Sequence, residues 1–197
     1  MKLRRLLDAL SANTPTRLEA LLMLLAGEGT IVDPDDRAGL HPLLVPIVRD
    51  DEGRTTGLLL WPTSPKELPM PVVRTSPHGL ELLAASVDRL LHRELALRDV
   101  SAHESLGGLL EAANRPGVLY EEGAVHTNPL PLKAYLLVKA GASPAFFDQL
   151  VASHLERGDT DAALITAERT LREFEGWGRQ LAVVAELYRA LGRMEEA

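Results

Sequence analysis

The chain has 197 residues, 46% of them hydrophobic, and a formal net charge of −7 at pH 7. This length allows one or two domains with a buried core. The negative charge argues against nonspecific binding to nucleic acid or to an anionic membrane, because both require a basic surface. Cysteine is absent, which excludes a disulfide framework, a thiolate metal site and a cysteine nucleophile. The apolar segment 18–26 is too short to span a bilayer, so we expect a cytoplasmic protein without membrane insertion or a cleaved signal.

Residues 1–140 are predicted to form an α-rich domain with a small antiparallel sheet. Helices are expected at 3–11 and 15–26. The apolar segments 43–48 and 56–61 flank an acidic turn, which is typical of a β-hairpin, and 72–74 is a candidate third strand. Because Pro46 has no N–H to donate, we expect the first strand to lie at an edge of the sheet.

The clearest helix of this domain is expected to begin at Ser76 and Pro77. Its apolar stripe would consist of Leu80, Leu83, Ala84, Val87, Leu91 and Leu95. Ser101 and Glu104 have the spacing of a capping box and predict a second helix that ends near Asn114. A further helix is predicted at 132–139.

The most informative pattern is a match between two stretches near the C-terminus. It pairs residues of like character: Phe147, Leu150, Val151, His154, Gly158 and Ala163 with Leu181, Val184, Ala185, Tyr188, Gly192 and Ala197. The spacing, about 34 residues, is typical of stacked helix–turn–helix units. Local signals agree, since Ser143 can cap the first helix, Gly158 can end it and Asp159 can cap the next.

Residues 144–197 resemble the tetratricopeptide repeat family, which places apolar, aromatic, glycine and alanine residues at these positions. The resemblance implies paired antiparallel helices whose inner groove binds a peptide or helix of a partner protein. The inner positions are occupied by Asp148, Gln149, Glu156, Arg179, Glu186 and Arg189. Acidic residues are in the majority there, so we expect a basic or amphipathic partner segment. The Lys and Asn with which some members hold a terminal carboxylate are absent.

Fewer than three repeats are rarely stable alone. We therefore expect the segment to lean on the N-terminal domain, to pair with another chain or to belong to a longer chain. Trp177, between the two repeats, is expected to fill the core. Self-association through the last helix, involving Tyr188 and Leu191, is a further hypothesis.

The alternative hypothesis is an enzyme or small-ligand sensor with a site between the hairpin and the helix starting near Ser76. His78, His92 and Trp61 would be its candidate residues. Trp61 is also a candidate hydrophobic anchor for a partner, although packing under its own loop would explain it equally well.

Two places in the sequence carry residues that could bind a metal. Asp88 and His92 stand four residues apart near Glu94 and His103, but a solvated helix face explains them better because no second ligand motif fixes a geometry. The acidic loop 33–36 lacks the register of a calcium loop. We therefore predict no catalytic residues, no metal and no cofactor.

The sequence thus predicts a mainly α, α+β protein with two domains, 1–140 and 141–197, and a β-hairpin at about 43–61. Its expected role is that of a protein–protein interaction module, a scaffold or an assembly factor.

Overall fold

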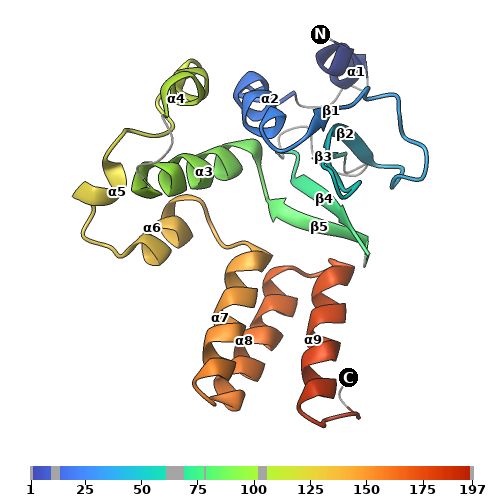
Figure 1. The fold of residues 1–197 in the computed structure, drawn as a ribbon, viewed down its shortest axis with the longest axis vertical. Helices are drawn as coiled ribbons and strands as arrows, with labels where there is room; N and C mark the ends of the chain where they lie inside the picture. The colour runs from blue at the N-terminus through green and yellow to red at the C-terminus, as the bar shows by residue number, and fades with distance from the viewer. Residues whose placement is uncertain (1, 10–13, 61–68, 78, 102–105, 196–197) are drawn as a thin grey trace.

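The computed structural model describes residues 2–9, 14–60, 69–77, 79–101 and 106–195 (Figure 1). The N-terminal elements are α1 (Lys2–Ala9), α2 (Leu18–Ala26), β1 (Thr30–Ile31), β2 (Leu44–Arg49), β3 (Thr55–Leu59), β4 (Val72–Ser76), β5 (Gly79–Ala84), α3 (Val87–Ser101) and α4 (Gly107–Asn114). They are followed by α5 (Ala124–Thr127), α6 (Leu132–Lys139), α7 (Pro144–Glu156), α8 (Thr160–Glu173) and α9 (Gly178–Ala190). This arrangement confirms the predicted α+β class and the helical C-terminal region.

The five strands form an antiparallel sheet in the order β1-β2-β3-β4-β5. The predicted hairpin is present as β2 and β3, but the prediction that its first strand lies at the edge is wrong, because β1 pairs with β2. β1 pairs with Val48 and Arg49, so Pro46 lies beyond the end of that ladder and its missing N–H removes no bond there. Pro46 faces Gly57 across the hairpin, next to a register shift.

The prediction that a helix begins at Ser76 is also wrong. Ser76 pairs with Gly79 in a second hairpin, β5 runs to Ala84, and α3 begins only at Val87. Leu80 and Leu82 pack on one face of the sheet, whereas Leu83 and Ala84 pack on the other. A strand that is buried on both faces has apolar residues at neighbouring positions. In the sequence, this pattern does not distinguish a strand from a buried helix.

The predicted role of Ser101 as the first residue of a capping box is wrong, and its predicted partner Glu104 lies outside the described residues. Ser101 is the last residue of α3, and its hydroxyl donates a 2.9 Å hydrogen bond back to the carbonyl of Arg98. The next helix, α4, begins at Gly107.

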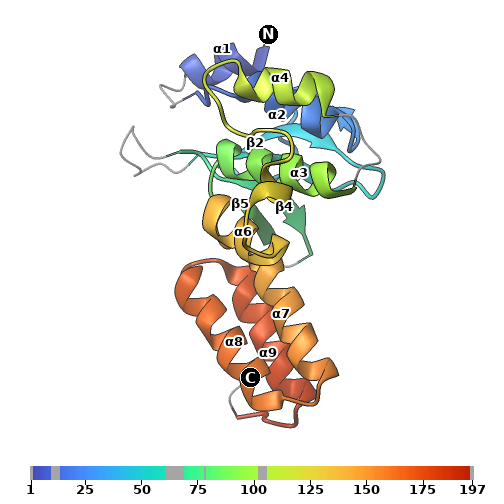
Figure 2. The ribbon, with the colours of Figure 1, turned by 90° about the vertical axis from the view of Figure 1, so that its left-hand side faces the viewer.

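The two faces of the sheet are covered by different parts of the chain. α2 and α3 cover the first face, where Leu21, Leu25, Leu91 and Leu95 pack with Val45, Ile47, Leu58 and Val72 in the main core. The second face carries Leu44, Leu59, Val73 and Leu82, against which Phe174 and Trp177 pack. The helices α7, α8 and α9 stand side by side as a column below the sheet (Figures 1 and 2). The C-terminal segment therefore leans on the N-terminal domain, one of the three arrangements expected from the sequence.

Candidate interaction surface

The helical column is built from local signals that the sequence contains. The hydroxyl of Ser143 accepts a hydrogen bond from the amide of Phe146 at the start of α7, and the carboxylate of Asp159 accepts one from Ala162 at the start of α8. Both caps use a donor that the first helical turn leaves without a backbone partner.

The turns that end α7 and α9 lie one repeat period apart and have the same geometry. Gly158 and Gly192 have φ values of +74° and +75°, a backbone region that favours glycine. The amide of Asp159 donates to the carbonyl of His154 at 3.0 Å, and the amide of Arg193 donates to the carbonyl of Tyr188 at 2.9 Å. The sequence repeat is therefore also a repeat of backbone geometry at these two helix ends.

Two of the six residues predicted to bind a partner contact each other. The guanidinium of Arg179 on α9 lies 2.9 Å from the carboxylate of Asp148 on α7 and 3.7 Å from that of Glu81 on β5. All three side chains are mostly buried. This ion pair network joins two helices of the column to the sheet, so Asp148 and Arg179 have a structural task beside the predicted binding role.

The other four predicted residues lie on the surface. Gln149 and Glu156 on α7 and Glu186 and Arg189 on α9 are all exposed. Glu81 did not emerge from the sequence as a partner of this surface, because nothing local relates a strand residue to a helix far along the chain. Trp61 and His78 fall outside the described residues.

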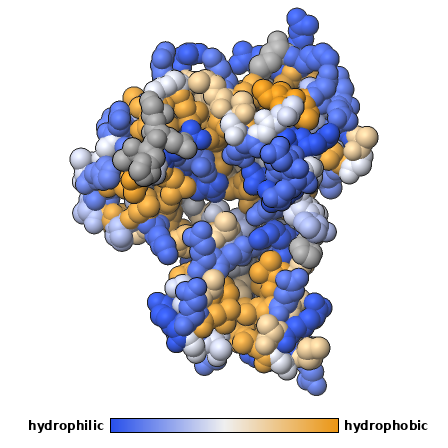
Figure 3. All heavy atoms as spheres, viewed as in Figure 1, coloured by the Kyte–Doolittle hydropathy of each residue, from blue (hydrophilic) through white to orange (hydrophobic). Residues whose placement is uncertain are grey.

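Apolar packing holds the three helices together. Leu164 and Ala167 of α8 form a core with Val184, Leu187 and Tyr188 of α9, and the Tyr188 hydroxyl donates to the carboxylate of Glu168. Tyr188 is thus buried inside the column, and self-association that uses it would require the helices to separate. Apolar atoms also reach the surface among these helices (Figure 3).

Trp177 was predicted to fill a core, and its ring packs into the core between the column and the second face of the sheet. It is the N-cap of α9, and it packs with Phe174 against the second face of the sheet. Phe174 also meets Phe147 of α7 edge to face, with ring centroids 5.9 Å apart. These aromatic side chains fix the column to the sheet.

Among the candidate residues of the alternative enzyme or sensor site, His92 lies within the described part of the chain. Its Nδ1 donates to the carbonyl of Leu119 at 3.1 Å, which leaves Nε2 of the neutral ring to accept from the hydroxyl of Tyr135 at 3.1 Å. Burial lowers the pKa of His92 below its ordinary value, and the nearby charge of Lys139 acts in the same direction. Both ring nitrogens therefore have partners within the protein.

Two tyrosines extend this polar cluster. Tyr120 donates to the carboxylate of Asp99, which also accepts from the amide of Gly123. Burial raises the pKa of both Tyr120 and Tyr135 above the usual range of a phenol. A cavity of about 320 Å³ opens beside the cluster, between α3, the 118–124 loop and α6. The cluster ties that loop and α6 to α3, a structural role that the sequence analysis missed; the chain's three tyrosines were the available signal.

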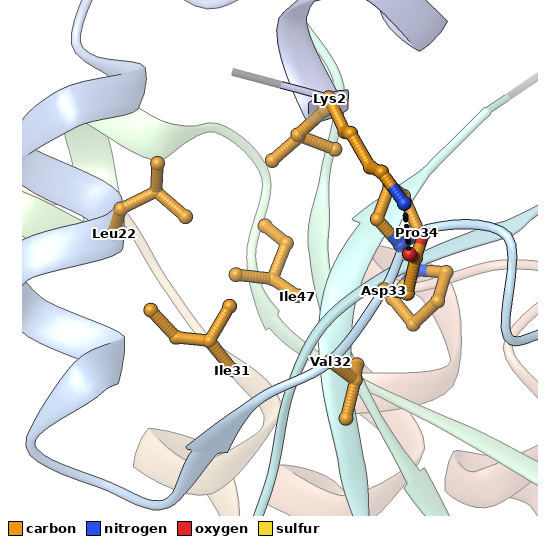
Figure 4. A pocket seen from close by; sticks show the side chains of 9 residues that line it. Lys2, Leu22, Ile31, Val32, Asp33, Pro34 and Ile47 are labelled. Carbon is orange, nitrogen blue, oxygen red and sulfur yellow. Dashed lines mark hydrogen bonds and ion pairs between the residues drawn. The ribbon is translucent and has the colours of Figure 1, made fainter.

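A second cavity, of about 400 Å³, lies between α1, α2 and the β1–β2 edge of the sheet (Figure 4). Leu3, Leu22, Ile31 and Ile47 supply its apolar wall, and an ion pair of 2.6 Å between Lys2 and Asp33 stands at its rim. This lining suits an apolar side chain and provides no buried acid or base. Within the described parts of the chain, no group of three metal-ligating side chains is assembled, and no helix has the length and apolar character to cross a membrane.

These features define an α+β protein in which a column of three helices is mounted on one face of an antiparallel sheet. Two family models match the chain, the PAB N-terminal model over residues 4–139 and the PAB middle domain model over residues 144–197. The chain therefore belongs to the PAB family. The tetratricopeptide resemblance is not confirmed as family membership.

A relative in Arabidopsis thaliana is named Protein IN CHLOROPLAST ATPASE BIOGENESIS, chloroplastic. It is 34% identical over 195 residues, which cover 96% of this chain and 58% of the relative. The chain thus spans less than two thirds of the relative's length. No solved structure matches. The predicted cytoplasmic location is wrong, because a relative that matches almost the whole chain is chloroplastic.

Proposed function

We propose that this protein is an assembly factor that takes part in the biogenesis of the plastid ATPase by binding another protein through its helical column. The observation that carries the proposal is the 34% identity, across 96% of this chain, with the relative named for chloroplast ATPase biogenesis. That alignment spans almost all of both the column and the sheet domain, by which we mean the five strands with α1 to α6. The proposal includes a plastid location, which detection of the native protein in isolated plastids would test.

The tetratricopeptide-like register supports the choice of the column as the binding element. Helix ends that recur once per repeat give α7 and α9 the same direction, opposite to that of α8, and stacked helices of this kind present an extended surface to a peptide or helix. The proposed inner surface runs along α7 and α9.

The charges on this surface favour a basic or amphipathic partner segment. Asp148 and Arg179 balance each other in their ion pair. The exposed positions carry the two carboxylates of Glu156 and Glu186 against the guanidinium of Arg189. Exposed charges of this kind attract a partner of opposite charge and repel one of like charge, and salt weakens both effects.

Calorimetry with the individually purified subunits of the chloroplast ATPase tests the proposal. We expect one subunit to bind, and the double variant Glu156→Arg with Glu186→Arg to bind it at least tenfold more weakly. The matched control changes two exposed acids outside the column, Asp51→Arg with Glu122→Arg, and leaves the affinity within about twofold. The proposal fails if no subunit binds, and the column is the wrong surface if the control weakens binding equally.

The enzyme or sensor hypothesis has no comparable support. The ring nitrogens of His92 and the hydroxyl of Tyr120 are engaged by Leu119, Tyr135 and Asp99. Self-association through α9 stays a prediction, for which light scattering of the purified protein is the direct test.

A further inference from the structure

We propose that the open side of α9, formed by Leu181, Ala185 and Arg189, is the docking site for an amphipathic helix of the partner protein. That helix would run antiparallel to α9, place an apolar residue on Leu181 and carry an acidic residue within reach of Arg189. The inference rests on the proposed function and states which secondary structure and which chemistry the column recognises.

Leu181 corresponds to Phe147, which lies one repeat earlier in the chain. Phe147 is only 5% exposed, because Phe174 at the end of α8 packs on it edge to face. Leu181 occupies the same position in the repeat on α9 and is 61% exposed. No described residue covers Leu181 as Phe174 covers Phe147. The position that α7 buries against the end of α8 is therefore exposed on α9.

Ala185 occupies the next position along the same stripe of α9. Val151 packs against the core of the column, and its counterpart Ala185 is half-buried. One helical turn separates Leu181 from Ala185, so the two lie on one side of α9. The small side chain of Ala185 lets a partner backbone come close, while Leu181 supplies apolar surface.

A positive charge lies beside this stripe. Arg189 lies two turns beyond Leu181, is exposed, and forms no ion pair with a described residue. Arg179 on the same helix is instead held by Asp148 and Glu81. The cation available to a helix that covers Leu181 is therefore Arg189, and the complementary residue on the partner is Asp or Glu.

Exposed leucine or isoleucine side chains are common on soluble proteins, so exposure alone does not define a site. Ile165 on α8 is 65% exposed, close to the value for Leu181. It has no covered counterpart within the repeat. Ile165 is therefore the matched control for an apolar side chain that is exposed without being a docking position.

The first experiment gives α9 a helix of known sequence. In the altered chain, residues 193–197 are replaced by a copy of residues 159–175. The added helix then follows Gly192 in the same way that α8 follows Gly158. We expect the melting temperature to rise by roughly 4 °C, since added burial of about 1–2 kcal/mol has this effect on a chain of this size. Leu181→Asp should cancel the rise, and Ile165→Asp should not. No rise, or a rise insensitive to Leu181→Asp, overturns the inference.

The second experiment uses the purified ATPase subunit that binds the wild-type protein. Leu181→Asp should weaken this binding at least tenfold, and Arg189→Glu severalfold, whereas Ile165→Asp should stay within twofold. Asp at position 181 is in the first turn of α9, where a negative charge favours the helix, so loss of binding would not reflect unfolding. The chain with the added helix should also bind at least tenfold more weakly, because its docking site is already filled.

These outcomes separate the two proposals. Wild-type affinity in Leu181→Asp and in the chain with the added helix overturns the docking site, while the proposed function stands because the subunit still binds. If no subunit binds the wild-type protein, the proposed function fails and the melting temperatures decide the docking inference alone. A dimer that dissociates on Leu181→Asp would show that a second copy covers this side of α9, which also overturns the inference.

Discussion

The sheet domain and the helical column differ in how they use their apolar residues. Around the sheet, strands β2 and β3 are buried on both faces, and the core reaches from α1 to α6. In the column, five buried residues form the core, and large apolar side chains such as Leu181 and Ile165 remain exposed. The large core lies around the sheet, whereas the column has a small core of its own and carries the surface that we propose for binding a partner.

The close packing of the sheet gives the largest expected effect. A Cβ added at Gly57 would come within 2.1 Å of the backbone oxygen of Val45, so Gly57→Ala must push β2 and β3 apart. We expect a loss of about 3 kcal/mol in the free energy of unfolding, measured by urea denaturation. Gly178→Ala in the column has open space around it and is expected to be neutral or slightly stabilising. Similar losses for the two variants would contradict the contrast.

Arg17 is expected to have the next largest effect. Its side chain is only 11% exposed and donates to the Asp88 carboxylate at 2.6 Å and to the carbonyls of Ala113 and Gly117 at 2.7 and 2.9 Å. Arg17→Ala leaves three acceptors without their donor and should cost about 2–3 kcal/mol. Arg115→Ala removes a mainly exposed pair with Glu19 and should cost less than about 1 kcal/mol. Urea denaturation of both variants checks this difference.

The attachment of the column to the sheet is tested by Trp177→Ala. Removing this half-buried ring from the second face of the sheet should cost about 2 kcal/mol. Hydrogen exchange should then speed up in α7, α8 and α9 while the strands keep their protection. Met194→Ala, at an exposed position in the same segment, is the control. A uniform loss of protection would mean that the column and the sheet unfold as one unit.

The smallest expected effect depends on pH. Burial makes the pKa of His92 lower in the folded chain than its unfolded value of 6.5, so the folded state binds fewer protons and stability rises with pH. This contribution is complete above the unfolded pKa and is lost as the pH falls through the folded one. His92→Gln should flatten the change in melting temperature between about pH 8 and pH 5. The same substitution at the exposed His126 should leave the wild-type profile, and a flattened profile there would refute the assignment to His92.

The sequence by itself determined those parts of the protein whose signals are local. Ser143 and Asp159 cap helices by bonding amides three residues away, and Gly158 and Gly192 end helices through a backbone conformation that favours glycine. The recurring spacing predicted the order and length of α7, α8 and α9, because each period of the sequence corresponds to one helix–turn–helix unit.

Only the tertiary structure decided which of these residues meet and which remain open. Strand β5 was mistaken for the start of a helix because both of its faces are covered, and the cover on one face comes from Phe174 and Trp177 far along the chain. Arg179 was assigned to a groove, yet Glu81 and Asp148 hold it, since an ion pair depends on distance in space and not in sequence. Leu181 matches Phe147 in the sequence and differs from it in exposure, because covering one helix depends on where the next one packs.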